Sequence, residues 1–182
     1  IMAARLGDGA GRSVQPLAYG ETVQLGDVTV WLSPAGHVLG SAQVVMEYEG
    51  SRTVCSGDYK RRPDPTCAAF VPVPCDVFIT EATFGLPVFR HPDPAAEIAK
   101  LLHSVAMFPE RCHVVGTYAL GKAQRLIALL RQAGWHRPIF LHGALLPLCD
   151  LYTRHGIDLG ELRPATAGEK GKPRQDLAGA LG

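Results

Sequence analysis

Two short turn signals constrain the first third of this chain more than any other feature of the sequence. Each separates two short apolar runs: Gly26-Asp27 lies between 23–25 and 28–32, and Glu49-Gly50 lies between 43–48 and 53–55. Glycine accepts the positive φ angles that two-residue hairpin turns require. Polar and apolar residues alternate loosely here, as in a sheet with one buried face. We therefore predict two consecutive β-hairpins within residues 14–56.

The pattern changes after Cys75, where short apolar runs alternate with longer stretches of helical periodicity. The predicted strands are 76–80, 112–116 and 138–141, and the predicted helices are 92–108, 120–133 and 144–154. We expect 76–80 to be a buried strand. Alternation of strands and helices at these lengths predicts a mostly parallel sheet with covering helices. The fold class is therefore α/β.

Composition sets further bounds. The chain has 182 residues, of which 47% are hydrophobic, enough for one ordinary domain or two small ones. A net charge of +1 means that any basic surface must be local. The five cysteines include no CxxC pair, which argues against a disulfide scaffold or a cysteine zinc knuckle and favours a reducing, cytoplasmic setting. No apolar run approaches the length of a membrane span, and we expect no membrane association.

Both ends of the sequence suggest a piece of a longer protein. The chain begins Ile-Met-Ala-Ala-Arg, and residues 178–182 read as the first residues of a helix. The stretch 163–182 is rich in Gly, Ala, Lys and Pro, and we expect it to be a loop or a frayed end.

The second hairpin predicts that His37 and Asp58 are neighbours. His37 lies in the loop just before the strand 43–48, and Asp58 follows the returning strand. Because a hairpin folds back on itself, both loops lie at its open end. An imidazole and a carboxylate at one sheet edge can begin a zinc or manganese site. A hydrogen-bonded His–Asp pair without a metal is an equal alternative on spacing alone.

Two further positions could carry chemistry. Glu81 ends the predicted strand 76–80, where α/β sheets place active-site groups, although a turn cap is the commoner role. The loop 116–122 joins a strand to a helix, so its free N–H groups and Lys122 could hold a phosphate. It is not a Walker loop, because Ala123 stands where that motif needs Ser or Thr. The alternative is an ordinary glycine-bearing connection.

Lys60-Arg61-Arg62 is a short basic run beside Asp58. Such a run is usually a solvated loop, but next to a metal site it could contact a nucleic-acid backbone. Among the other histidines, His142 is the only further candidate for a site, and we favour a structural role for it.

Four motifs together resemble those of the metallo-β-lactamase-fold nucleases of the β-CASP subgroup, and they occur in the order of that family. They are Pro-Ala-Gly-His-Val-Leu-Gly-Ser-Ala-Gln at 34–43, Ser-Gly-Asp-Tyr at 56–59, Thr-Glu-Ala-Thr-Phe-Gly at 80–85 and Ala-Leu-Gly-Lys-Ala-Gln at 119–124. The stretch 56–66 is most similar to the bacterial ligase-associated DNA exonucleases, a group also described as mRNA 3′-end processing factors. The resemblance weakens after Thr166.

The resemblance implies a partial αββα metallo-β-lactamase sandwich over residues 1–90, part of an inserted parallel-sheet β-CASP domain over 91–163, and an irregular end at 164–182. It implies two divalent ions, zinc or manganese, with His37 ligating one and Asp58 bridging both. Glu81 would orient a histidine that protonates the leaving group. The reaction would be phosphodiester hydrolysis of nucleic acid, DNA rather than RNA, with a DNA ligase as a functional partner.

The chain also departs from the family pattern. The first metal motif, HxHxDH, and the two later histidine motifs are missing from the sequence. We therefore expect this chain alone to bind metal poorly and to be inactive. Three alternatives remain. The first is an RNA-processing nuclease of the same family. The second is another hydrolase on the same fold, against which the α/β segment after Glu81 argues, and the third is a non-catalytic nucleic-acid-binding relative.

Overall fold

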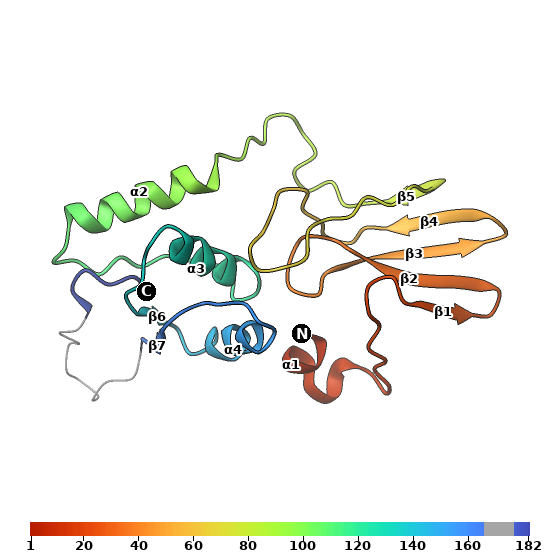
Figure 1. Ribbon diagram of the computed structural model, residues 1–182, viewed down its shortest axis with the longest axis horizontal. Helices are drawn as coiled ribbons and strands as arrows, with labels where there is room; N and C mark the ends of the chain where they lie inside the picture. Colours follow the sequence, from red (N-terminus) through yellow and green to blue (C-terminus); the bar gives the residue numbers. More distant parts are fainter. Residues whose placement is uncertain (166–176) are drawn as a thin grey trace. The chain divides into compact units, whose positions relative to one another are not determined.

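A computed structural model describes residues 1–165 and 177–182 of the chain. The chain forms two compact units, Ile1–Phe89 and Arg90–Gly182, and each is described by itself (Figure 1). Within the described residues, no helix is both long and apolar enough to span a membrane.

The first unit contains a five-stranded sheet in the order β1-β2-β3-β4-β5. A short helix α1 (Met2–Leu6) and a 3-10 turn (Gly7–Ala10) precede it. The strands are β1 (Thr22–Leu25), β2 (Val28–Pro34), β3 (Ala42–Tyr48), β4 (Ser51–Cys55) and β5 (Val77–Ile79). Neighbours from β1 to β4 are antiparallel, and β5 runs parallel to β4.

Both predicted hairpins are confirmed. Leu25 pairs with Val28 across the first turn, and Tyr48 pairs with Ser51 across the second. In the second turn Glu49 and Gly50 have φ angles of 48° and 79°. Positive φ at both central positions is the mark of a type I′ turn, whose twist matches that of the strands.

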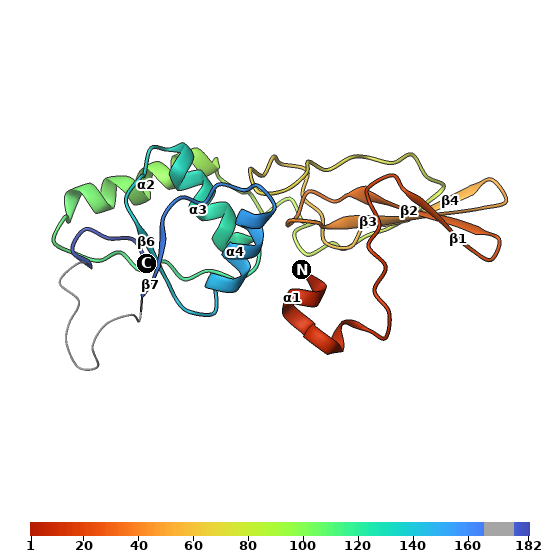
Figure 2. The same cartoon turned by 60° about the horizontal axis from the view of Figure 1, so that its bottom comes forward.

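One face of this sheet is covered by the connection from β4 to β5, which Figure 2 shows running along the sheet. The Val71 carbonyl accepts hydrogen bonds from Ser33 Oγ at 3.4 Å and Gln43 Nε2 at 2.7 Å. Val45 and Val54 pair across β3 and β4 on the same face and are fully buried. These contacts form the core of the unit.

The expectation that 76–80 is a buried strand is wrong. Val77, Phe78 and Ile79 are 47%, 45% and 56% exposed. The reason is position: β5 is the edge strand, and in the described part of the chain β4 is its only neighbour. Apolar composition alone could not separate a central strand from an edge strand.

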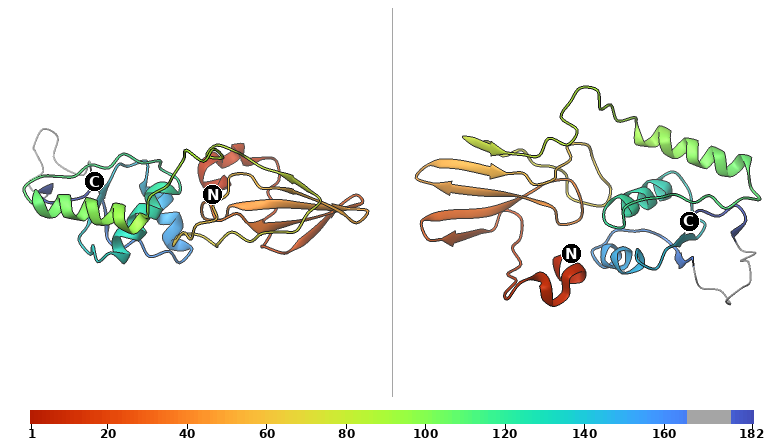
Figure 3. Two further views of the ribbon diagram at one scale, coloured as in Figure 1. Left: turned by 90° about the horizontal axis from the view of Figure 1, so that it is seen from above. Right: turned by 180° about the vertical axis from the view of Figure 1, so that it is seen from behind.

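The second unit is built from three helices and short parallel strands. Its elements are α2 (Pro94–Met107), α3 (Lys122–Gln132), β6 (Ile139–Leu141), α4 (Leu146–Arg154) and β7 (Leu162–Pro164). Strands β6 and β7 are parallel, as predicted for this half. Helices α3 and α4 lie side by side (Figure 3), and Gln124 Nε2 lies 3.4 Å from Cys149 Sγ between them.

Two segments of 163–182, the stretch expected to be a loop or a frayed end, pair with other segments of the unit. Leu162–Pro164 forms β7, and Leu181 bridges both His113 and Ile139 in parallel. Leu181 is only 2% exposed, so it belongs to the core of this unit. The segment 112–116 was predicted to be a strand, and in the structure His113 of this segment forms the bridge to Leu181. The rest of that expectation, 166–176, lies outside the described residues. All of these pairings are parallel, which agrees with the predicted α/β fold class.

Candidate functional site

His37 lies in the tight loop that joins β2 to β3. Ser41 Oγ accepts the N–H groups of His37 and Val38 at 3.0 and 3.1 Å, which fixes the backbone around the imidazole. Gly36 precedes His37 with φ +71°, and a Cβ there would overlap the Lys60 carbonyl oxygen and lie 2.8 Å from the Phe70 nitrogen. Only glycine allows the loop to press this closely against the β4–β5 connection.

The loop that carries Asp58 lies against the His37 loop. The Lys60 N–H donates to the Ala35 carbonyl at 2.9 Å, which ties the two loops together. His37 Nε2 and Asp58 Oδ2 are 3.7 Å apart, and the two side chains are 43% and 75% exposed. The hairpin therefore brings the imidazole and the carboxylate together at its open end, accessible from solvent.

Glu81 reaches the same end of the sheet by a different route. The Ser56 N–H donates to the Ile79 carbonyl at 2.9 Å, and Ser56 Oγ donates to Thr80 Oγ1 at 3.1 Å. The chain therefore leaves β4 and β5 side by side, with Asp58 beyond one and Glu81 beyond the other.

Local contacts keep Glu81 ionised. Its Oε2 accepts the Thr83 N–H at 2.7 Å. This bond lowers the pKa of the Glu81 carboxyl most, the Thr83 side chain lowers it further, and the charge of His37 adds a smaller effect in the same direction.

The donor chemistry of this site fits a divalent ion, but the donor set is small. Imidazole nitrogen and carboxylate oxygen are ordinary ligands of zinc and manganese. Among residues 1–165 and 177–182, however, no group of three or more His, Cys, Asp or Glu side chains is placed to hold a metal. His37 and Asp58 therefore form a partial ligand set.

The predicted phosphate-binding residues differ in their surroundings. Lys60 Nζ pairs with the carboxylate of Asp64, whose side chain is 2% exposed and also accepts from the Thr66 hydroxyl at 2.6 Å. This ion pair turns Lys60 inward, away from the role suggested by the basic run. Arg61 is exposed.

Three N–H groups at the end of the loop before α3 already have partners within the chain. Gly121 N–H donates to Gln124 Oε1 at 2.7 Å, Lys122 N–H to the Leu120 carbonyl and Ala123 N–H to the Tyr118 carbonyl. These three groups are therefore not available to a phosphate. The Lys122 ammonium remains exposed, 5.0 Å from the centre of the Tyr118 ring.

Sequence reasoning missed the residues that hold these loops. Ser41 and Ser56 fix the loops of His37 and Asp58, and Gln124, which is fully buried, closes the loop before α3. Ser41 and Gln124 lie inside the quoted motifs, four residues after His37 and two after Lys122. Their positions within these motifs could have identified them from the sequence. His142 Nδ1 accepts the Ala144 N–H at 3.2 Å, a local contact that fits the structural role favoured for it.

Comparison with known proteins gives relatives but no matching family model. The chain is 34% identical to a probable DNA ligase of Opitutus terrae over 86% of the chain and 15% of that protein. It is 31% identical to cleavage and polyadenylation specificity factor subunit 3 of Dictyostelium discoideum, covering 75% of the chain and 19% of the relative. It is 30% identical to ribonuclease TTHA0252 of Thermus thermophilus, over 76% of the chain and 30% of that protein.

A solved structure, a protein of unknown function from Enterococcus faecalis V583, shares the fold. Its TM-score is 0.53 at 14% identity, over 92% of this chain and 41% of the other. The chain spans less than a third of the length of each of the three relatives above. Their sequences and the α/β fold agree with the motif resemblance, and the chain belongs to the metallo-β-lactamase-fold β-CASP nucleases.

Proposed function

We propose that the protein containing this chain hydrolyses phosphodiester bonds of nucleic acid with two divalent metal ions, zinc or alternatively manganese. The observation that carries this proposal is the approach of His37 and Asp58 to 3.7 Å at the open end of the hairpin, with Glu81 just beyond the neighbouring strand β5. Relatives named as ribonucleases and endoribonucleases support it. On this proposal His37 and Asp58 would hold the ions, and Glu81 would orient a histidine.

When bound, such ions would activate water and stabilise the charge that builds on phosphate oxygens. The residues of this chain serve that chemistry by position. Ser41 holds the His37 backbone, and the Lys60 backbone holds the Asp58 loop. Glu81, kept ionised by Thr83, presents an acceptor that can hold an imidazole N–H in one orientation.

We further propose that residues 1–90 form part of the metallo-β-lactamase domain and 91–163 part of the β-CASP insert. On this assignment the chain by itself lacks most metal ligands. We expect it to bind zinc weakly and to have no nuclease activity. Atomic absorption after dialysis measures this directly, and one tightly held zinc ion per chain would contradict it.

The substrate we propose is DNA, with a DNA ligase as functional partner. The likeness to a probable DNA ligase over 86% of the chain favours this choice. RNA is the second candidate, because relatives are named endoribonuclease, ribonuclease and cleavage and polyadenylation factor. Exposed Arg61 and Lys122 would contact the backbone of either polymer.

The test uses protein expressed from its complete reading frame, with DNA and RNA oligonucleotides of one sequence and added zinc or manganese. We expect Asp58→Ala to lower cleavage by about 100-fold or more, since a metal ligand would be lost. Asp27→Ala, which removes an exposed carboxylate in the first hairpin turn, is the matched control and should cleave normally. Full activity of Asp58→Ala would overturn the proposal. Faster cleavage of RNA than of DNA would show that the substrate is RNA and not DNA.

A further inference from the structure

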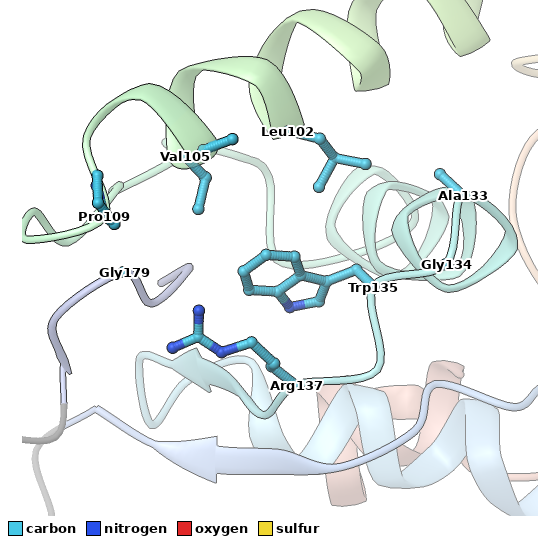
Figure 4. A pocket seen from close by; sticks show the side chains of 9 residues that line it. Leu102, Val105, Pro109, Ala133, Gly134, Trp135, Arg137 and Gly179 are labelled. Carbon is cyan, nitrogen blue, oxygen red and sulfur yellow. The ribbon is translucent and has the colours of Figure 1, made fainter.

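The second unit contains a cavity that is separate from the residues of the proposed nuclease site. It lies between the C-terminal end of α2, the residues after α3 and Gly179, with a volume of about 370 Å³ (Figure 4). Leu102, Val105 and Pro109 supply apolar walls, and Trp135 and Arg137 supply the polar groups. This volume falls within the range of small-molecule sites, roughly 300–1,000 Å³.

The two polar residues are held rigidly in place. Helix α3 ends in a Schellman motif: Gly134 has φ +90°, and the Trp135 N–H donates to the Leu130 carbonyl at 3.0 Å. Arg131 Nη1 then donates to the carbonyls of both Trp135 and Arg137, at 2.8 and 2.7 Å. The backbone of the site is therefore fixed before any ligand arrives, which reduces the entropy lost on binding.

The Arg137 guanidinium is the charged group of this cavity, and it lies beside the Trp135 indole. Trp135 Nε1 is buried and has no hydrogen-bond partner. The Arg137 guanidinium carbon lies 5.2 Å from the centre of the indole ring, and Figure 4 shows the guanidinium on the side to which the indole nitrogen points. Within the described residues Arg137 pairs with no carboxylate; its one hydrogen bond, to the Ala178 carbonyl, is 3.3 Å long.

The Arg137 guanidinium strongly favours an acceptor that carries negative charge. The apolar walls favour a ligand whose remaining part is flat or apolar. Together these two features favour one ligand chemistry.

We propose that this cavity binds a small organic anion, a phosphate or carboxylate carried on an aromatic body. The anion pairs with the exposed Arg137 guanidinium, and the aromatic body packs against Leu102 and Val105 beside the Trp135 indole. This site does not depend on the proposed nuclease activity.

The indole N–H resonance of Trp135 reports a ligand that binds beside the indole in ¹⁵N-labelled protein. The chain has two tryptophans, so Trp31→Phe identifies the Trp135 signal. The probes are adenosine monophosphate for the phosphate source and benzoate for the carboxylate source. Adenosine lacks the anion and inorganic phosphate lacks the aromatic body, so each carries only one part of the proposed ligand. We expect a saturable shift of the Trp135 signal with at least one of the two complete probes and much weaker binding of both halves.

Variants separate this site from non-specific attraction of anions. Arg137→Gln should weaken binding of the effective probe about tenfold, and Arg137→Lys, which keeps the charge, should weaken it less. Arg154→Gln, at an exposed arginine of α4, is the control and should bind as the wild type does. No saturable shift with either probe, equal affinity for inorganic phosphate alone, or unchanged binding by Arg137→Gln would each overturn the proposal.

Discussion

Gly36→Ala should destabilise the first unit far more than Gly40→Ala, although both glycines share one loop and the same φ of +71°. A left-handed conformation costs a non-glycine residue about 1 kcal/mol, and both variants bear that cost. At Gly40 a Cβ meets nothing within 4 Å. At Gly36 it meets two backbone atoms of the β4–β5 connection, which cannot swing aside as a flexible side chain would.

Forcing extra volume into such a contact costs roughly 2 kcal/mol, so we expect losses of unfolding free energy of about 3 kcal/mol for Gly36→Ala and about 1 kcal/mol for Gly40→Ala. Urea unfolding followed by Trp31 fluorescence in a Trp135→Phe background measures the first unit alone. Losses that agree within about 0.5 kcal/mol would refute the argument that the His37 loop is pressed against this connection.

Three further predictions follow from single residues. Arg131→Met should lower the stability of the second unit by about 3 kcal/mol or more in thermal unfolding, since one guanidinium donates to four backbone carbonyls. The pKa of Glu81, followed by carboxyl NMR, should lie below its ordinary value and rise partway in Thr83→Ala, which removes the second of its causes. Because folding lowers this pKa, the stabilisation is present above the ordinary carboxyl pKa and is lost as pH falls through the lowered one. Burial raises the pKa of the Cys149 thiol, so a thiol reagent should modify exposed Cys112 first and Cys149 only on unfolding.

Each of these has a clear contrary result. Arg131→Met that melts with the wild type would show that its four hydrogen bonds are replaced by water without loss. An unchanged Glu81 titration in Thr83→Ala would show that the Thr83 side chain does not lower the pKa of Glu81. Equal rates of thiol modification at Cys112 and Cys149 in the folded protein would contradict the burial of Cys149.

The parts of the fold that depend on local chemistry could be predicted from the sequence. The turns at Gly26-Asp27 and Glu49-Gly50 follow from backbone preferences of a few residues, and the adjacency of His37 and Asp58 follows from the second hairpin. The three helices of the second half begin within two residues of their predicted positions, because their apolar spacing is a local signal.

The parts of the fold that depend on residues distant in the sequence could not be predicted. The exposure of β5 depends on which elements lie beside it, and amino-acid composition gives no information about those neighbours. The pairing of Leu181 with His113 and Ile139 joins segments far apart in sequence through a few residues, too short for any periodicity. The loop before α3 appeared to offer free N–H groups because a pattern does not reveal that the Gln124 side chain folds back to accept one of them.

The central claim is that His37 and Asp58 contribute ligands to a metal centre in the complete protein. Zinc content per chain, measured by atomic absorption on protein from the complete reading frame, tests it most directly. We expect two ions in the wild type and in Asp27→Ala, and a loss of at least one ion in both His37→Ala and Asp58→Ala. Two ions retained in either of those variants would contradict the assignment of that residue as a ligand.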